Sequence, residues 1–283
     1  MLRLASFSLA LALAASGCAS EEGEGTVQFT TYGEAFIEQQ IPAEAVADGW
    51  TITYGKFLVV LSDVSVAESA TAAPVARMPA PRLFDMHVPG AKAVFSASGL
   101  PARSYEHVSY MVTPATAATE LGDGVPAADK QRMLDAGYSV WVEGTATRGA
   151  ESKRFAWGFR TSTLFDRCEG PVSGRTTPGV VVKNGGTDAV ELTIHGDHLF
   201  YDDLQDPKAK VRFDNLAAAD ANADGEVTLE ELAAVKLASL PPGKGTYGTG
   251  SAAGINDLRA FVEALSRTVG HFRGEGECFA VPR

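Results

Sequence analysis

The sequence lacks the motifs that identify many hydrolases and metalloproteases. It has no G-x-S-x-G nucleophile elbow, because the serine of residues 250–254 stands in the wrong position, and it has no H-E-x-x-H zinc motif. Basic residues are also few: 24 Lys and Arg against 35 Asp and Glu give a net charge of −11. A nucleic-acid-binding protein normally has the opposite balance. We therefore expect no enzyme activity and no nucleic-acid partner.

Cysteine is scarce, and the first of the three cysteines lies at the end of an N-terminal processing segment. Arg3 supplies a positive charge, and residues 4–15 form an apolar run that is too short to span a bilayer comfortably. The small residues Ala-Ser-Gly at 15–17 stand directly before Cys18. We expect residues 1–17 to be a signal peptide rather than part of the fold.

The residues before Cys18 resemble the lipobox of bacterial lipoproteins, although Ala15 replaces the commoner leucine. The resemblance implies cleavage before Cys18, with lipid such as palmitate on its sulfur and amine, and hence a membrane-anchored protein of the bacterial cell envelope. Ala19 is not the aspartate that often retains such lipoproteins at the inner membrane, so an outer-membrane location is favoured. An ordinary secretory signal is the alternative. Residues 18–26, rich in Glu and Gly, are predicted to be a flexible tether.

The other two cysteines are predicted to pair with each other. Cys168 and Cys278 belong to the part of the chain that would be exported to an oxidising compartment, where disulfides persist. A disulfide between them would tie the C-terminal tail to the middle of the chain. The alternative is two free thiols.

The sharpest motif is the stretch D-A-N-A-D-G-E-V-T-L-E-E at residues 220–231. It resembles the EF-hand calcium loop, with oxygen-bearing residues at alternating positions and Gly225 at the sharp turn. The resemblance implies six calcium ligands, of which one acts through its backbone carbonyl: Asp220, Asn222, Asp224, Glu226 (the carbonyl), Thr228 and Glu231. An ordinary turn between two helices is the alternative.

Helical periodicity flanks this loop, and only one such loop is visible. Helices are predicted at residues 211–219 and 230–240, and a C-terminal amphipathic helix is predicted to be capped by Asn256. EF-hands usually occur in pairs, so a lone loop in millimolar extracellular calcium is expected to stabilise the fold rather than to sense calcium.

The rest of the chain has the pattern of a β protein. Residues 56–66 have apolar side chains of both parities, which predicts a central strand that is buried on both faces. Residues 100–105 (Leu-Pro-Ala-Arg-Ser-Tyr) resemble a recurring feature of bacterial β-sandwich lipoproteins with transthyretin-like or immunoglobulin-like topology. A short helix is expected at 126–136. Further strands are expected at 27–31, 35–39, 50–54, 93–96 and 105–112, with hairpins at 138–146/154–161 and 180–183/189–194.

We therefore predict a mainly β protein with an α appendage, namely an antiparallel β-sandwich with one EF-hand helix–loop–helix and a C-terminal amphipathic helix. The predicted segments are a signal peptide (1–17), a tether (18–26), a β-sandwich domain (27–200), an EF-hand (201–240), and a glycine-rich loop with the last helix and the cysteine tail (241–283).

A second possible metal site is the sequence His195-Gly196-Asp197-His198 at the end of a predicted strand. Two imidazoles beside a carboxylate suit zinc or copper. Residues three apart on a regular strand face opposite sides, so a bulge at Gly196 would be needed to bring them together. One or more of three other histidines could complete the shell: His87, His107 and His271. The alternative is that these histidines make local hydrogen bonds, or lie singly in the core or on the surface.

In its general character, rather than in any motif, the chain is similar to some secreted copper-handling proteins of methane-oxidising bacteria. Those proteins are β-sandwiches that bind copper through two histidines and an oxidised tryptophan. This chain has Trp50, Trp141 and Trp157, for which core packing is the alternative role.

Two functions remain open at this point. The first is a calcium-binding lipoprotein of the cell envelope with a binding or structural role, in which calcium stabilises the fold. The second is a periplasmic or surface copper- or zinc-handling protein that uses His195 and His198. The sequence names neither the envelope protein nor the ligand that would be the partner.

Overall fold

The computed structural model of the protein describes residues 23–283. The predicted signal peptide and the predicted lipid-bearing Cys18 lie outside the described residues. Within 23–283, no helix is both long enough and apolar enough to cross a membrane.

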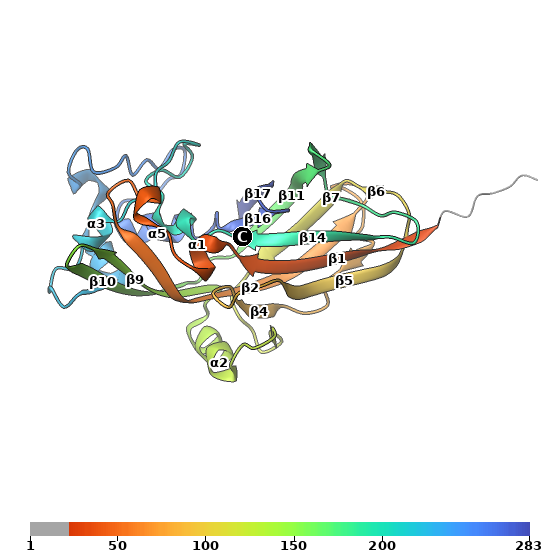
Figure 1. Cartoon of the computed structure of the whole chain (residues 1–283), viewed down its shortest axis with the longest axis horizontal. Coiled ribbons are helices and arrows are strands. Elements are labelled where there is room, and N and C mark those ends of the chain that lie inside the picture. Colours follow the sequence, from red (N-terminus) through yellow and green to blue (C-terminus); the bar gives the residue numbers. More distant parts are fainter. Residues whose placement is uncertain (1–22) are drawn as a thin grey trace, which may run out of the picture.

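The long strand β2 (Thr51–Ala67) runs through the middle of an elongated molecule (Figure 1). Its central residues are buried on both faces, as the apolar run of both parities predicts. Phe57, Val59 and Leu61 pack into the main core, whereas Leu58 and Val60 pack into a second, smaller core beneath helix α2. The strand therefore holds two layers of the molecule together.

The larger sheet is built around β2. Its strand order is β12-β11-β7-β2-β9-β10-β15; β17 pairs with β11, β3 and β4 pair with β2, and β8 pairs with β4. Besides β2, its strands are β3 (Ala76–Arg77), β4 (Arg82–Asp85), β7 (His107–Val112), β8 (Glu120–Leu121), β9 (Val140–Arg148), β10 (Glu151–Phe159), β11 (Thr163–Val172), β12 (Arg175–Pro178), β15 (Glu226–Val227) and β17 (Glu277–Pro282).

The smaller sheet has the order β16-β14-β1-β5. Strands β1 and β14 run parallel, and Gly33 at the end of β1 lies opposite Ile194 at the end of β14. The strands are β1 (Glu24–Gly33), β5 (Lys92–Pro101), β14 (Thr187–Ile194) and β16 (Gly270–Phe272), and a separate short pair is formed by β6 (Ser104–Tyr105) and β13 (Val180–Val181).

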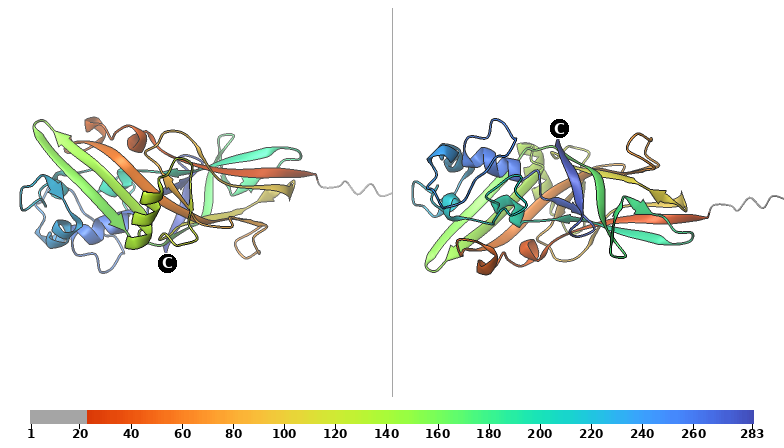
Figure 2. Two further views of the ribbon diagram at one scale, coloured as in Figure 1. Left: turned by 90° about the horizontal axis from the view of Figure 1, so that it is seen from below. Right: turned by 90° about the horizontal axis from the view of Figure 1, so that it is seen from above.

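The helices are short and lie outside the sheets. Figure 2 shows the C-terminal helical segments gathered at the end of the molecule that is opposite the tip of β1. The α-helices are α1 (Ala35–Glu38), α2 (Ala127–Ala136), α3 (Asp214–Ala217), α4 (Leu229–Ala234) and α5 (Leu258–Leu265), and the 3-10 helices are η1 (Ala43–Ala45), η2 (Asp197–Phe200) and η3 (Leu237–Ser239).

The predicted fold class is confirmed, since the chain is mainly β with small helical appendages. Strands β9 and β10 form the predicted hairpin, and three aromatic residues of β10 share one buried face, as alternation predicts: Phe155, Trp157 and Phe159. Helix α2 ends at Gly137, whose φ of 65° is the left-handed conformation expected of a helix-terminating glycine.

Several local predictions were wrong. The strand predicted at residues 35–39 is instead helix α1 (Ala35–Glu38), and β1 begins at Glu24, inside the segment predicted as a tether. Residues 180–194 do not form a hairpin: β13 pairs with β6, whereas β14 pairs with β1 and β16. Strand β14 pairs with strands distant in the sequence because it then lies between two strands, and both of its edges are hydrogen-bonded.

The helices around the calcium-type loop are shorter than predicted. The helix before the loop is the four-residue α3, and the helix after it ends at Ala234, ahead of the short 3-10 helix η3. Helix α5 is capped by Asp257, whose side chain accepts a hydrogen bond from the Ala260 N–H, and not by Asn256.

The predicted disulfide between Cys168 and Cys278 is confirmed. It joins β11 to β17 across 110 residues of sequence, and Cys168 is fully buried. Closing so long a loop restricts the unfolded chain and thereby stabilises the folded one.

Replacing both cysteines by serine should lower the free energy of unfolding by about 2–5 kcal/mol, because the unfolded chain regains the freedom of that loop. Urea unfolding with and without reductant checks this. Reductant should bring the wild-type protein down to the stability of the double variant and leave the variant unchanged. Equal stability of the oxidised wild type and the variant would contradict the prediction.

Candidate metal centre

Two neighbouring strands deliver the first residues of the site. Because β1 and β14 run parallel and end in register, Glu34 and His195 leave the sheet side by side. The His195 N–H donates to the Val269 carbonyl at 2.8 Å, which ties this point of the chain to the segment before β16. Register in a parallel ladder thus determines which side chains meet at this edge.

A glycine then turns the chain so that the second histidine faces the first. A Cβ at Gly196 would lie 2.6 Å from Ile37 Cγ1 and 2.9 Å from Tyr54 Cε2, so only glycine fits this close approach. The chain continues into the 3-10 helix η2, which carries His198. The two histidines therefore come together through a helical turn, and the predicted strand bulge was wrong.

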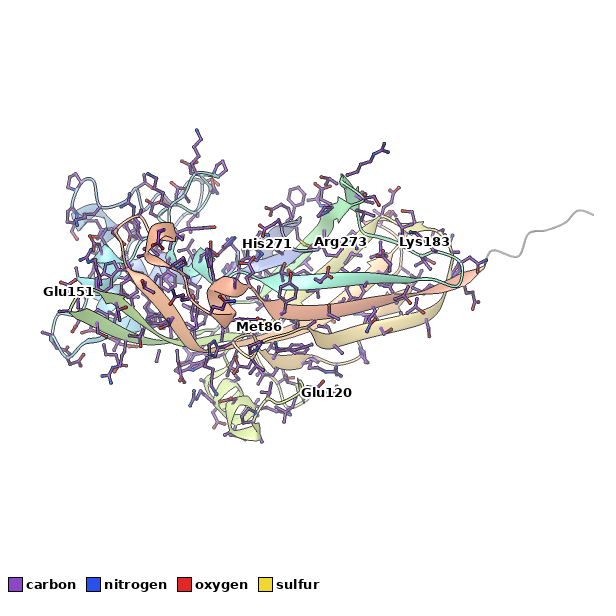
Figure 3. The ribbon with its side chains drawn as sticks, viewed as in Figure 1. Met86, Glu120, Glu151, Lys183, His271 and Arg273 are labelled. Carbon is purple, nitrogen blue, oxygen red and sulfur yellow. A yellow bond between two sulfur atoms is a disulfide. The ribbon has the colours of Figure 1, made fainter. Side chains whose placement is uncertain are left out.

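The third histidine comes from the adjacent strand β16, where His271 pairs with Thr193. Figure 3 labels His271 near the middle of the long axis, where β14 ends. The His271 and His195 rings stack with their centroids 3.9 Å apart, and the His198 ring lies 4.9 Å from His271 and 5.5 Å from His195. Of the three extra histidines considered from the sequence, His271 is the one that joins the pair.

The ring nitrogens of this cluster are arranged as metal ligands. One ligand nitrogen from each of His195, His198 and His271 lies within 4.8 Å of the other two. Nδ1 of His198 lies 3.0 Å from Thr268 Oγ1, which leaves its Nε2 free. Nε2 of His195 and Nδ1 of His271 are buried and have no hydrogen-bond partner. Buried polar atoms rarely stay unpaired, so these two nitrogens point to a ligand.

Carboxylates stand next to the histidines. Glu34 Oε1 lies 2.7 Å from His195 Nε2, an ion-pair contact when the ring is protonated. Glu34, His195 and Glu275 form a second set of ligand atoms within 4.8 Å of one another. A carboxylate beside a ligating imidazole orients the ring and makes it more basic.

Burial keeps two of the imidazoles neutral. It lowers the pKa of His198 to about 3 and that of His271 to about 4, with further lowering by the neighbouring histidines. Burial also lowers the pKa of His195, but the Glu34 carboxylate outweighs it and the net pKa is raised. Neutral imidazole is the form that binds metal.

The cluster lines a pocket of about 550 Å³. Tyr201 stands at the pocket next to His198, with ring centroids 4.7 Å apart, and donates a 2.8 Å hydrogen bond to Asp197 Oδ2. Burial raises the pKa of Asp197, whose other carboxylate oxygen has no partner. Cys278 of the disulfide also lines the pocket.

The other histidines and the tryptophans have local roles. His87 Nδ1 lies 2.9 Å from the Ile37 carbonyl oxygen, and His107 Nε2 lies 2.8 Å from Asp166 Oδ1. None of the three tryptophans lines the pocket. Their indole N–H groups donate elsewhere: Trp50 to Asp214, Trp141 to Glu143 and Trp157 to the Val227 carbonyl.

The predicted calcium loop has the expected backbone but not converging side chains. Gly225 takes the positive φ of 80° that the turn requires, and β15 of the loop pairs with β10. Among residues 23–283, the clusters of three or more ligating side chains are the two sets at the histidine pocket, so the loop carboxylates do not gather. Glu231 instead forms a capping box with Thr228 at the start of α4.

Other predicted loop ligands bind a lysine, backbone amides or one another, as where the Asn222 amide donates to Asp224 Oδ2 at 2.9 Å. Asp220 pairs with Lys153 and accepts from the Gly225 N–H, and Asp224 accepts from the Glu226 N–H. The pKa of Asp220 is lowered, mainly by Lys153. Calcium binding by this loop remains a prediction.

Two members of the histidine pocket were not foreseen. Glu34 and Glu275 lie in stretches with no motif, and only the pairing of β1 with β14 and of β14 with β16 brings them near His195. No periodicity or spacing in the sequence connects these positions.

The metal-free protein should lose stability on acidification because of two of these histidines. An unfolded histidine takes up a proton near pH 6.5, whereas folded His198 and His271 stay neutral to about pH 3 and 4. In that window the unfolded state binds more protons, so the free energy of unfolding falls as the pH falls. His195, with its raised pKa, acts in the opposite sense: the stability it adds is present below pH 6.5 and is lost above its folded pKa.

Urea unfolding of the metal-free protein between pH 7 and 4 measures this dependence. His271→Gln should make the fall shallower than in the wild type, because one neutral buried imidazole is gone. An unchanged slope in this variant would contradict the assignment.

Comparisons with known proteins do not identify a family for the chain. No protein-family model and no curated protein matches the chain. Among solved structures, the chain is similar to MbnP from Methylosinus trichosporium, with 11% sequence identity and a TM-score of 0.32, over 65% of this chain and 84% of that one. At this TM-score the similarity carries no argument about function.

Proposed function

We propose that the protein binds one copper or zinc ion through His195, His198 and His271 and acts as a metal-handling protein. The observation that carries the proposal is the convergence of three imidazoles with two buried nitrogens that lack partners. Imidazole is a good ligand for copper and zinc. Three ligands leave one position of a tetrahedral ion open, and the adjoining pocket gives access to it.

The surroundings of the three histidines support a metal rather than a purely structural role. Two of the rings are neutral at physiological pH and have no proton to release, whereas His195, whose pKa is raised by Glu34, gives up its proton when the metal binds. The Glu34 carboxylate can hold the His195 ring in position. A packed core would normally place apolar side chains here, because buried imidazoles without partners lower stability.

The lipobox resemblance at Cys18 supports an envelope location for this function. In that setting the ion would come from outside the cytoplasm, and the lipid would hold the protein at the membrane. Metal handling at the outer membrane is therefore part of the proposal.

His198→Ala and His271→Ala should each weaken copper or zinc binding at this site by more than about 100-fold. Loss of a ligand costs more than the 10–100-fold that is typical when a supporting residue is lost. Titration calorimetry of the mature protein, in competition with a chelator of known affinity, measures the change.

His107→Ala is the matched control, because His107 pairs with Asp166 away from the pocket and should keep full affinity. The proposal is wrong if the wild type binds neither metal, or if the His107 variant loses as much affinity as the other two.

A second candidate function is calcium binding by residues 220–231, which would stabilise the fold. The favouring observation is that the side chain of Asp220, at the first ligand position, is covered and already holds the Lys153 ammonium group. A cation is thus accepted at this carboxylate. The turn at Gly225 and the pairing of β15 with β10 support a loop shape close to the one that calcium needs.

Calcium at about 100 times its dissociation constant should raise the free energy of unfolding by about 2.7 kcal/mol. Glu231→Gln should weaken binding about tenfold or more, because one ligand charge is lost. Lys153→Met should strengthen it, since calcium no longer competes with the ammonium group for Asp220. Thermal unfolding with added calcium checks all three proteins, and an unchanged melting temperature in each would dismiss this candidate.

A further inference from the structure

Strand β17 is an edge of the larger sheet, and one of its two sides has no partner. Thr163 of β11 lies opposite Val112 of β7 on one side and opposite Pro282 of β17 on the other, so β7 and β17 flank β11. Within residues 23–283, β17 pairs with no strand besides β11. An open edge presents unpaired N–H and C=O groups to which another strand can be added.

The backbone groups on the open side of β17 belong to Cys278 and Ala280. The Arg283 N–H donates to the Ser162 carbonyl at 2.9 Å, so the backbone of Arg283 faces β11. Successive residues of an antiparallel strand point their N–H and C=O groups to alternate sides, and those of Cys278 and Ala280 therefore point away from β11. Pro282, which has no N–H, occupies the same side and ends the open edge, as proline commonly does on edge strands.

The open edge borders the pocket of the three histidines. Cys278 and Ala280 line this pocket, and so does Phe165, the cross-strand partner of Ala280 on the same face of the sheet. A strand added to the open edge would send alternate side chains into the pocket. Its other side chains would lie beside Phe279, which is 59% exposed, more than any other large hydrophobic residue of 23–283.

The pocket carries negative charge that no lysine or arginine neutralises. No basic side chain other than the three histidines lines it. Five carboxylates line it, and within residues 23–283 none of them forms an ion pair with a lysine or an arginine: Glu34, Asp197, Asp206, Glu275 and Glu277. One divalent ion on the histidines would leave most of this charge without a counter-ion.

One of these carboxylates is also short of a hydrogen-bond donor. Asp197 is 8% exposed, and although its Oδ2 accepts from the Tyr201 hydroxyl, its Oδ1 has no partner. Polar atoms buried in this way are normally satisfied by a donor. An ammonium group offers three donors and a positive charge, so it matches both needs of the pocket.

We propose that the pocket and the open edge of β17 bind an extended, basic segment of a partner protein, which adds a strand to the larger sheet. Backbone hydrogen bonds to Cys278 and Ala280 hold the segment, and the pocket carboxylates select its charge. The segment that fits alternates basic side chains, which enter the pocket, with apolar side chains, which cover Phe279. None of these contacts uses an imidazole ring, so the inference does not depend on the proposed metal function.

A second copy of this chain does not fit the same edge. The chain has a net charge of −11, and pairing of β17 with its own copy would bring a second Glu275 and Glu277 to the pocket. Like charges that meet across an interface cost affinity. The partner is therefore a different and basic protein.

Fluorescence anisotropy of a labelled heptapeptide that alternates lysine and valine tests the charge selection, with the metal-free mature protein in EDTA. The wild type should bind this peptide, less tightly as salt is added, and should not bind the counterpart with glutamate in place of lysine. The double variant Glu275→Gln/Glu277→Gln should bind about fivefold more weakly or worse, because two exposed charge pairs are lost. Glu44→Gln is the control, since Glu44 lies on η1 outside the pocket lining, and it should keep full affinity.

Ala280→Pro tests the added strand, because it removes an outward N–H and leaves the charge unchanged. It should weaken binding about fivefold through the lost hydrogen bond. Two N-methylated forms of the peptide make the same test without altering the protein. Each has its amides blocked at alternate residues, so only one form turns blocked amides toward β17; that form should lose binding and the other should keep it.

The remaining outcomes would overturn the inference. They are no binding of the lysine–valine peptide by the wild type, equal binding of the two N-methylated forms, and competition by free putrescine as strong as that by the unlabelled peptide. The last two would show a site for amines rather than for a strand. Because the binding is measured in EDTA, its failure would leave the proposed metal site of the three histidines untouched, and failure of the metal site would leave the peptide result untouched.

Discussion

The parallel pairing of β1 with β14 is the constraint on which the candidate metal centre depends. It places Glu34 beside His195, and the pairing of β14 with β16 then adds His271. Side chains alternate along a strand, so a slip of one residue would turn these groups to opposite faces. The centre is therefore a property of strand register as much as of the residues themselves.

The same centre is costly to the metal-free fold. Ring nitrogens of His195 and His271 and one oxygen of Asp197 are buried without partners, whereas a packed core would contain apolar side chains there. The main core elsewhere is dense in aromatic residues, for example where Phe155, Trp157 and Phe200 meet. Three of the seven buried side-chain atoms without a hydrogen-bond partner in residues 23–283 thus lie in this one pocket, and such local exceptions are common at functional sites.

Much of the architecture could be predicted from local sequence. The run at 56–66 predicted β2, the alternating aromatics predicted the β9–β10 hairpin, and the isolated pair Cys168 and Cys278 predicted the disulfide. These features could be predicted because a single sequence shows the periodicity of its side chains and leaves only two cysteines to pair with each other. Helix α1 (Ala35–Glu38) was missed because one turn of helix is too short to show a period of 3.6 residues.

The metal centre could be predicted only in part. The H-x-x-H spacing pointed to His195 and His198, but His271 was one of three candidates and Glu34 had no signal at all. Residues 180–194 carried a good hairpin turn, yet β14 found distant partners, because long-range pairing depends on the whole sheet rather than on the turn. The contacts that form the site join residues far apart in the sequence, and local sequence patterns do not predict such contacts.

The position of the disulfide next to the pocket bears on when the centre can exist. Cys278 lines the pocket, and the pocket residues run from Glu34 near the start of the described chain to Ala280 near its end. A chain that is still being synthesised has only fragments of this pocket. It follows that the pocket is completed last, when strand β17 has paired with β11 and the disulfide between Cys168 and Cys278 has formed.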